Sequence, residues 1–296
     1  MHKIYCIGML LASVIFSNCY AQLSDIARID YTNLPGANSG IEYNRTRALF
    51  NYPIKLKKEG TYLFLGLDYS NVNLITNDKE LIFNSEELDD FQLLDFNIGY
   101  TAPLKNDWRL GFRFTPGFSS NLSAKNFSIE DVVLSSDLVF IKDKTKDDTV
   151  EKPWRLIFGV SYSGNRGFNF PLPFISYYKK LNKKWSYNLG IPKTNIQYHI
   201  SKKHRLKYYV ELDGFTSNLQ SGILLNNNET AESINMSLII SGLQYEYHIA
   251  KHVQFYITSA YILDNKVRLR DRKRNNIEAL DDSNIIYLRT GIKLKI

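Results

Sequence analysis

Apolar and polar side chains alternate along most of the chain. In residues 108–115, large apolar side chains occupy the even positions, and Arg109, Gly111 and Arg113 lie between them. The same alternation recurs in four other segments, which begin at Leu94, Trp154, Leu206 and Ile286. Because successive side chains of a β-strand point to opposite faces, this pattern predicts strands with one apolar and one polar environment.

The connections between these segments alternate between short and long. Short turns, most of them with lysine, are expected at residues 57–60, 105–106, 181–183, 201–203 and 250–251. Longer polar segments are expected at residues 71–90, 120–129, 216–232 and 265–282. A soluble β-sandwich also alternates, but short turns at one rim and long loops at the other are typical of outer-membrane barrels.

Fourteen segments carry a strand pattern: 24–33, 41–56, 61–70, 91–103, 107–119, 130–142, 153–164, 172–180, 184–190, 194–200, 204–215, 233–248, 252–264 and 283–296. The sequence therefore predicts a closed antiparallel transmembrane β-barrel of about 14 strands, with both termini at the short-turn rim. Segments 24–33, 184–190 and 194–200 are short or weakly patterned, so twelve strands remain an alternative. The turn at residues 142–152 is longer than this rim should contain.

The N-terminus predicts export. Lys3 precedes an apolar run at residues 4–16, and Cys19-Tyr20-Ala21 offers a cleavage site before Gln22. We expect a signal peptide at residues 1–21 and a barrel domain at residues 22–296. A lipoprotein with Cys19 as the lipidated residue is the alternative. Cys6 and Cys19 are the only cysteines of the chain, so the mature protein has no disulfide and no thiolate metal site.

The polar face of the strands carries both signs of charge. We expect nine residues to line the lumen: Asp68, Asp95, Arg109, Arg113, Arg155, Lys207, Glu211, Asp213 and Arg289. Charged rings of this kind select ions and solutes in water-filled pores. They can equally pair with one another and plug a narrow barrel, and the sequence leaves both possibilities open.

Aromatic residues make up 14% of the chain, with 20 Tyr and 17 Phe. The three tryptophans, Trp108, Trp154 and Trp185, each follow a polar turn and open a strand. Tyrosine and tryptophan concentrate at membrane–water interfaces, where an apolar ring carries a polar edge. We therefore predict that the three tryptophans form part of an interfacial aromatic belt at one depth.

Catalytic chemistry is not expected. The mature chain has four histidines, His199, His204, His248 and His252, and all of them flank short turns rather than the long-loop rim where a surface hydrolase would act. Without paired carboxylates at metal-ligand spacing they predict no metal site. The basic run at residues 266–274 lacks the stacking aromatics of a nucleic-acid site, and the net charge is only +7. The basic run is opposite in charge to the loop at residues 71–90, which is acidic. This suggests that the two loops meet over the barrel mouth.

Three segments carry a resemblance to a known family: the signal peptide, "FPLPFISYYKKLNKKWSYNLGIPKTNIQYHI" and the closing "NIIYLRTGIKLKI". They resemble an uncharacterised family of Bacteroidota outer-membrane β-barrels, a domain of unknown function. In that family a Gly-x-Pro step follows a Trp-containing strand, as Gly190-Ile191-Pro192 does here, and a tyrosine, here Tyr198, follows soon after. The resemblance implies a fold and a location in the bacterial outer membrane, and it brings no activity or catalytic residues. The chain ends in Ile296, whereas barrel precursors commonly end in an aromatic residue.

These patterns together predict a passive or weakly selective channel for small solutes. The alternative is a structural or surface-interaction barrel with a plugged lumen. An outer-membrane hydrolase and a soluble periplasmic protein that binds an apolar ligand are more distant alternatives. The expected partners are outer-membrane lipid, lipopolysaccharide and the barrel-assembly machinery, and no cofactor is expected.

Overall fold

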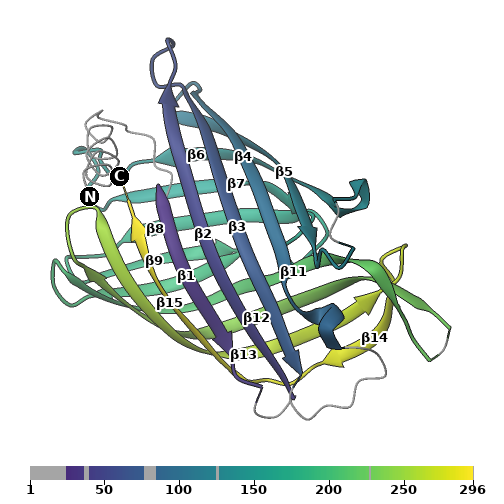
Figure 1. Cartoon of the computed structure of the whole chain (residues 1–296). Coiled ribbons are helices and arrows are strands. Elements are labelled where there is room, and N and C mark those ends of the chain that lie inside the picture. The colour runs from purple at the N-terminus through teal and green to yellow at the C-terminus, as the bar shows by residue number, and fades with distance from the viewer. Residues whose placement is uncertain (1–24, 37–39, 77–84, 125–126, 227, 296) are drawn as a thin grey trace, which may run out of the picture.

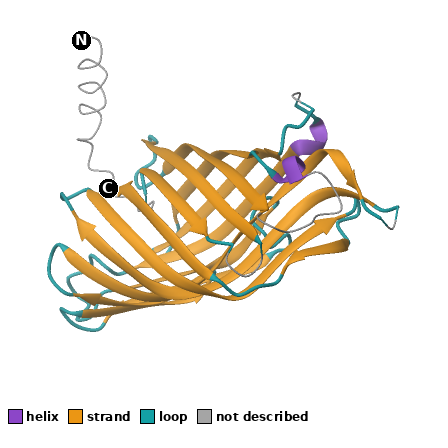
Figure 2. Ribbon diagram, turned by 60° about the horizontal axis from the view of Figure 1, so that its bottom comes forward, coloured by secondary structure: helices purple, strands orange, loops and turns teal. Residues whose placement is uncertain are grey.

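The computed structural model describes residues 25–36, 40–76, 85–124, 127–226 and 228–295. The predicted signal peptide, residues 1–21, lies outside these residues. Most of the described chain is β-strand, as Figure 2 shows. Two short 3-10 turns, η1 (Ser85–Leu88) and η2 (Ile129–Asp131), interrupt it. Across the described ranges, no helix combines the length and the apolar composition that a membrane crossing requires.

A single sheet of fifteen strands contains all of the β-structure that is described. The strands are β1 (Ala27–Leu34), β2 (Ile41–Lys55), β3 (Tyr62–Thr76), β4 (Phe91–Pro103), β5 (Trp108–Ser120), β6 (Val132–Asp143), β7 (Trp154–Ser163), β8 (Leu172–Lys180), β9 (Trp185–Ile191), β10 (Lys193–His199), β11 (His204–Leu224), β12 (Thr230–His248), β13 (Val253–Arg270), β14 (Asn276–Asp281) and β15 (Ile286–Leu294).

The sheet closes on itself. Each wall strand pairs antiparallel with the next, and β1 pairs with β15 from Ala27↔Leu294 to Asn33↔Leu288. The short strand β14 pairs with the far end of β13, and β13 pairs directly with β15, so fourteen strands form the wall. Figure 1 shows the strands winding around the barrel, with β1 beside β15. The predicted fourteen-stranded closed barrel is confirmed, and the weakly patterned segments form β1, β9 and β10.

The two faces of the wall have different environments. On β5, Phe112 and Phe114 are exposed on the outside, whereas Arg113 between them turns inward to an ion pair with Asp137 of β6. On β4, Asp95 and its alternate neighbours are buried while the residues between them are exposed. Closure gives every wall strand a hydrogen-bonded neighbour on both sides.

Large apolar side chains surround the outside of the barrel. Each of the fourteen wall strands contributes at least one such residue with an exposed fraction of 41% or more: Ile29, Phe50, Leu67, Ile98, Phe112, Leu138, Phe158, Ile175, Leu189, Ile196, Tyr208, Leu243, Ile257 and Leu288. We call this set the apolar belt. A surface of this extent is far larger than the apolar patches of ordinary soluble proteins.

The two ends of the barrel differ. At the short-turn end, where β1 begins and β15 ends, turns such as residues 104–107 and 181–184 connect the strands. The longest of these connections, residues 144–153, is held together by Lys144, whose ammonium pairs with Asp107 (2.8 Å) and Asp147 (2.6 Å). This explains how an unusually long turn fits at this end.

The wall is low on one side at the opposite end, which we call the long-loop end. Strands β9 and β10 have seven residues each and are joined through Pro192 alone. The next strands, β11 and β12, have 21 and 19 residues. The predicted loop at residues 216–232 is therefore mostly strand, with an irregular register between Asn218 and Ile223. Leu219 and Ile223 of β11 and Ile234 of β12 are buried. We call residues 215–234 the crossing hairpin.

The crossing hairpin spans the mouth of the barrel at the long-loop end. Asn218 of β11 pairs in parallel with Ser120 of β5, although β11 and β5 lie on different sides of the wall. The hydroxyl of Ser119 donates to the carbonyl of Thr216 (2.7 Å), and the amide of Gln220 donates to Asp131 (2.6 Å).

An apolar core lies beneath the hairpin. The ring of Phe215 is 6.0 Å from Tyr43 of β2 and 5.6 Å from Phe91 of β4. The core also contains Leu34, Val72, Leu74, Leu219, Ile223, Met236, Leu238, Val267 and Leu269, all with exposed fractions of 3% or less. This apolar seal closes the long-loop end in the described structure.

Candidate functional site

A cavity of about 590 Å³ occupies the barrel interior toward the short-turn end. Turn residues Thr145 and Lys146 line one part of it, and Leu49, Val139 and Ile157 supply inward apolar side chains from the wall. We call this cavity the chamber. A second cavity of about 320 Å³ lies between the chamber and the apolar seal and shares Arg28, Arg47, Asp68 and Arg166 with it. Among the described residues, the interior space therefore reaches the apolar seal, where Leu93 and Phe215 line the second cavity.

Positive charge predominates in the chamber. Seven cationic side chains line it, Arg28, Arg47, Arg109, Arg113, Lys146, Arg155 and Arg166, and they face four carboxylates, Asp25, Asp68, Asp137 and Asp143. Two of the arginines are held by carboxylates of the adjoining strand: Nε of Arg47 lies 2.8 Å from Asp68, and Nε of Arg113 lies 2.6 Å from Asp137. The surplus favours anions over cations in this space.

The loop at residues 164–171, between β7 and β8, folds into the lumen. Asn165 donates to Asp95 of β4 (2.8 Å), while the carbonyl of Gly167 accepts from Asn235 (2.7 Å) and Ser237 (2.9 Å) of β12. Gly167 has a φ of +58°, and a Cβ there would lie 2.4 Å from the carbonyl oxygen of Met236. Only glycine permits so close an approach of the two backbones.

Arg166 lies at the centre of this inward loop. Its guanidinium is 3.8 Å from Asp68, and its side chain is 51% exposed to the internal space that both cavities share. An ion or solute that moved between the chamber and the second cavity would therefore pass this guanidinium.

A charged bridge crosses the lumen beside the second cavity. Both terminal nitrogens of Arg45 on β2 lie 3.1 Å from the carboxylate of Asp213 on β11. Arg289 of β15 pairs with the same carboxylate, and the hydroxyl of Tyr287 donates to it (2.7 Å). The four side chains are largely buried, and they hold three separate parts of the wall at a fixed distance.

A second charged network lies on the interior of β11, β12 and β15. Glu246, with a fully buried side chain, accepts from Nζ of Lys207 (2.7 Å) and Nε of Arg205 (2.5 Å). Lys293 lies 3.8 Å from the same carboxylate. A carboxylate surrounded by three cations is fully compensated, so this network stabilises the wall and leaves a positive excess.

The nine residues predicted to line the lumen lie on the interior face. Four line the chamber, Asp68, Arg109, Arg113 and Arg155; four line the second cavity, Asp95, Glu211, Asp213 and Arg289; and Lys207 belongs to the Glu246 network. The prediction omitted Arg45 and Arg47, although their two-residue spacing on a strand places them on one face. It also omitted Arg166, which lies in a loop without any periodic pattern.

The histidines do not form a catalytic arrangement among the described residues. Nε2 of His199 lies 2.9 Å from the hydroxyl of Ser186, but Ser186 is only 1% exposed and inaccessible to a substrate. Nδ1 of His204 contacts the hydroxyl of Tyr245 (2.5 Å), and Nδ1 of His252 lies 3.1 Å from the carbonyl of Lys295. The described part of the chain also contains no group of three potential metal ligands from His, Cys, Asp and Glu.

The tryptophans occupy equivalent places in the wall. Trp108, Trp154 and Trp185 are the first residues of β5, β7 and β9, all of which start at the short-turn end. Each ring lies against another aromatic ring on the wall, Phe158, Tyr177 and Tyr198 respectively. Their common depth in a membrane stays a prediction.

The ion pairs that the structure describes for the basic run at residues 266–274 do not involve the acidic loop at residues 71–90. Arg268 pairs with Asp282 (2.5 Å), and Arg272 pairs with Glu130 of η2 (3.1 Å). Two of the loop's acidic residues, Asp78 and Glu80, lie outside the described residues. The suggestion that the two loops meet over the mouth therefore stays a prediction, whereas the crossing hairpin is seen to cover it.

Comparisons with known proteins give a family and a set of similar folds. Residues 36–295 match the model of a family described as "Domain of unknown function (DUF6268)". No protein with a curated description matches. Among solved structures, the chain is similar to the NanC porin (12% identity, 91% of this chain and 100% of that chain, TM-score 0.38). It is also similar to the KdgM porin in complex with disordered oligogalacturonate (11%, 91% and 99%, TM-score 0.37). A third similar structure is a mutant of the TodX monoaromatic hydrocarbon channel (8%, 91% and 89%, TM-score 0.39).

Proposed function

The chain belongs to the DUF6268 family, and we propose that it is an outer-membrane β-barrel channel for small anionic solutes whose extracellular mouth is closed by its own crossing hairpin. The observation that carries this proposal is the apolar belt on all fourteen wall strands. Lipid surrounds a closed barrel on all sides, and an apolar surface on every wall strand is the surface that such a surround favours.

The orientation of the barrel in the membrane follows from the lengths of the connections between its strands. In outer-membrane barrels the short turns face the periplasm and the longer loops face the outside. The chamber then opens toward the periplasm, and the apolar seal lies at the extracellular mouth. Export of the chain by a signal peptide at residues 1–21 belongs to the same proposal.

The chamber supports the choice of an anionic solute. Seven cationic side chains face four carboxylates there, and Arg166 lies where the chamber meets the second cavity. Focused positive potential within a low-dielectric wall raises the local concentration of anions and lowers that of cations. The apolar lining, which includes Leu49 and Val139, also accommodates a solute with an uncharged part.

The apolar seal determines the resting state. Phe215 packs between Tyr43 and Phe91, and the residues around it are almost completely buried, so neither water nor ions cross this layer. Conduction requires that the crossing hairpin move away from β5. A barrel with a permanently plugged lumen, kept for a structural or surface role, is the second candidate, and the charged bridge between Arg45 and Asp213 favours it.

One variant separates these candidates. Gly214 and Ser237 are paired, so replacing residues 215–236 with Asn-Gly closes the hairpin with a two-residue turn and removes the whole crossing hairpin, including Phe215 of the seal. In planar bilayers the intact protein should conduct rarely, and the shortened variant should give steady conductance steps.

Folding and location are tested separately. Both forms should remain in the outer-membrane fraction and should migrate differently in gels before and after boiling. A shortened variant that retains this heat-modifiable mobility and stays silent in bilayers would establish the plugged barrel instead. Absence of the protein from the outer-membrane fraction would overturn the location.

A further inference from the structure

One sector of the barrel is entirely basic in sequence. Residues 152–210, which run from the start of β7 into β11, contain twelve Lys and Arg residues and no Asp or Glu. Many of the lysines lie at strand ends and turns of the short-turn end, where β8 meets β9 and β10 meets β11. Local carboxylates are therefore absent from the sequence around them.

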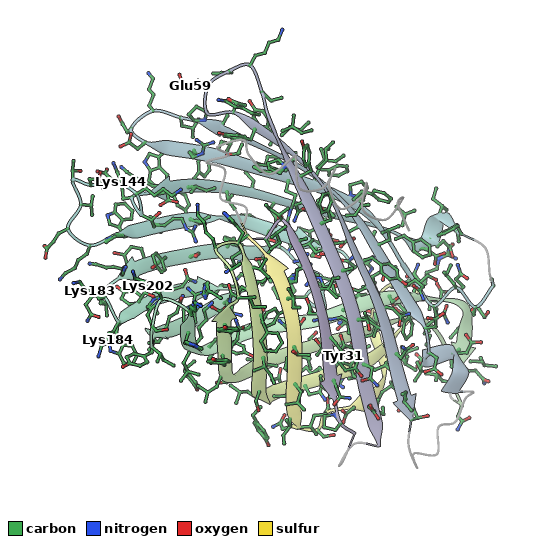
Figure 3. The ribbon with its side chains drawn as sticks, turned by 60° about the vertical axis from the view of Figure 1, so that its left-hand side comes forward. Tyr31, Glu59, Lys144, Lys183, Lys184 and Lys202 are labelled. Atoms are coloured by element: carbon green, nitrogen blue, oxygen red, sulfur yellow. The ribbon has the colours of Figure 1, made fainter. Side chains whose placement is uncertain are left out.

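The fold brings these turns together. The backbone N–H of His199 donates to the carbonyl of Lys184 (2.7 Å), which ties the end of β10 to the β8–β9 turn. The backbone N–H of His248 donates to the carbonyl of Lys203 (2.8 Å), which ties the end of β12 to the β10–β11 turn. Figure 3 shows Lys183, Lys184 and Lys202 close together at one edge of the barrel.

A groove of about 410 Å³ lies between the turns, and we call it the basic groove. Its lining includes Lys180, Lys183, Lys184, Lys202, Arg205 and Ile200, and it contains no carboxylate. Arg205 is engaged with Glu246, but the four lysines have no carboxylate within 4.0 Å in the described part of the chain. Elsewhere at this end Lys144 is paired with two aspartates, so the basic groove is a distinct concentration of uncompensated charge.

Apolar side chains border the same turns. Leu181, Ile200 and Ile249 are 45%, 54% and 50% exposed. Trp185 is 43% exposed, and its ring lies 4.8 Å from the ring of Tyr198 in a tilted arrangement. Exposed aliphatic and indole side chains beside lysines are the pattern of a membrane–water interface. A soluble anion would use only the lysines, whereas a lipid would use both kinds of side chain.

We propose that the basic groove binds the phosphate headgroup of an anionic phospholipid in the periplasmic leaflet, with the acyl chains lying along Trp185 and its apolar neighbours. This inference rests on the proposed membrane location. Each lysine ammonium has three N–H groups that can donate to phosphate oxygens. Near an anionic membrane surface, each additional lysine adds a similar contribution to the binding free energy.

Trp185 provides a local reporter. In a variant with Trp108→Phe and Trp154→Phe, Trp185 fluorescence is measured in bilayers of phosphatidylcholine with a minor fraction of brominated lipid. The bromines are near the headgroup end of the acyl chains, and the brominated lipid carries either a phosphatidylglycerol or a phosphatidylcholine head. The brominated anionic lipid should show on the order of fivefold stronger relative association.

Matched variants test the groove. Changing Lys183, Lys184 and Lys202 together to Glu should remove the preference, and changing Lys57, Lys58 and Lys105 to Glu should leave it intact. The control lysines are exposed in other turns of the same end and carry the same change in charge. Equal loss in both triple variants would show a general surface-charge effect and overturn the site.

Two further outcomes are decisive. Binding of inorganic phosphate to the wild-type groove in pure phosphatidylcholine bilayers, without a preference for the anionic lipid, would assign the groove to a soluble phosphate compound instead. If neither brominated lipid quenches Trp185, the barrel is not in the bilayer and the proposed function itself fails. Equal quenching by both lipids would overturn only the lipid site.

Discussion

The carboxylate of Asp213 on β11 accepts from both terminal nitrogens of Arg45 on β2, at 3.1 Å each, across 168 positions of sequence. Because these strands lie on different sides of the lumen, the pair holds the walls together from within. Arg289 shares the carboxylate and also lies 3.9 Å from Glu211, whereas Arg45 pairs with Asp213 alone among the ion pairs of the described residues.

Replacing Asp213 with Asn should strongly destabilise the barrel. Removing one partner of a buried ion pair typically costs about 3–5 kcal/mol, because the remaining charges stay buried without compensation. Urea-dependent folding into lipid vesicles measures the change. The exposed Asp148→Asn substitution is the control and should shift the midpoint little. Equal stability of the two variants would show that Asp213 does not hold the walls.

Replacing Phe215 with Ala should open a leak at the seal as well as lower stability. The ring is 1% exposed between Tyr43 and Phe91, and truncating such a side chain costs about 3–5 kcal/mol and leaves a void. We expect more frequent opening events in planar bilayers. Tyr208→Ala removes an outward-facing ring from the same strand and should leave opening unchanged. An unaltered opening frequency for Phe215→Ala would mean that the seal lies elsewhere.

The shortened-hairpin variant should conduct anions better than cations, because cationic side chains outnumber carboxylates in the chamber. Adding Arg166→Glu to that variant should shift the reversal potential under a salt gradient toward cation selectivity. The change places a carboxylate where the two cavities meet. Arg272→Glu, on a side chain 77% exposed near η2, has the same charge change and should have little effect. If Arg272→Glu shifts the reversal potential as much as Arg166→Glu does, the charges that select ions lie outside the chamber.

The three tryptophans should share one depth. A quencher at the middle of the bilayer should leave Trp108, Trp154 and Trp185 largely unquenched, since each begins a strand at the short-turn end. A quencher at the headgroup level should reach the exposed ring of Trp185 best. Single-tryptophan variants measured by steady-state fluorescence provide the comparison. Strong mid-bilayer quenching of any one of them would contradict the predicted belt.

The long turn after β6 should respond to acid. A hydrogen bond from Lys144 lowers the pKa of Asp147 to about 2, and the same ammonium lowers the pKa of Asp107. A carboxyl group with a lowered pKa stabilises the folded turn above about pH 4 and loses that contribution as the pH falls toward 2. Carbon-13 NMR of the carboxyl groups should show the pKa of Asp147 rising toward 4 in Lys144→Ala. No rise would remove Lys144 as the cause.

The wall was predictable because closure of a barrel requires one regular pattern. Alternation in segments such as residues 108–115 revealed the outer and inner faces. The weakly patterned segments at residues 184–190 and 194–200 were also predicted as two strands, and they form β9 and β10. These two strands were hard to recognise because seven residues contain few alternations, and only pairing with their neighbours makes them strands.

The interior was less predictable. Individual charges such as Asp213 follow from the face on which they lie, but their partners depend on which walls face each other, as with Arg45. Phe215 and Leu219 lie at the inward positions of their strand, as Asp213 does, but the sequence does not show that the strand continues across the mouth and packs Phe215 against Tyr43 and Phe91. Arg166 and Gly167 act from a loop that turns inward, which is a tertiary property without a sequence period.

The short strands β9 and β10 have a consequence for the surrounding bilayer. Seven residues extend roughly 24 Å along a strand, and the usual tilt reduces the height to roughly 18 Å, against an apolar band of about 25 Å in outer-membrane barrels. The opposite wall, with fifteen residues in β2 and in β3, has no such deficit. Hydrophobic mismatch on one side only must be relieved by local thinning of the membrane or by leaning of the barrel axis toward β9 and β10. At the proposed location in the outer membrane, the barrel would therefore deform the bilayer on one side only.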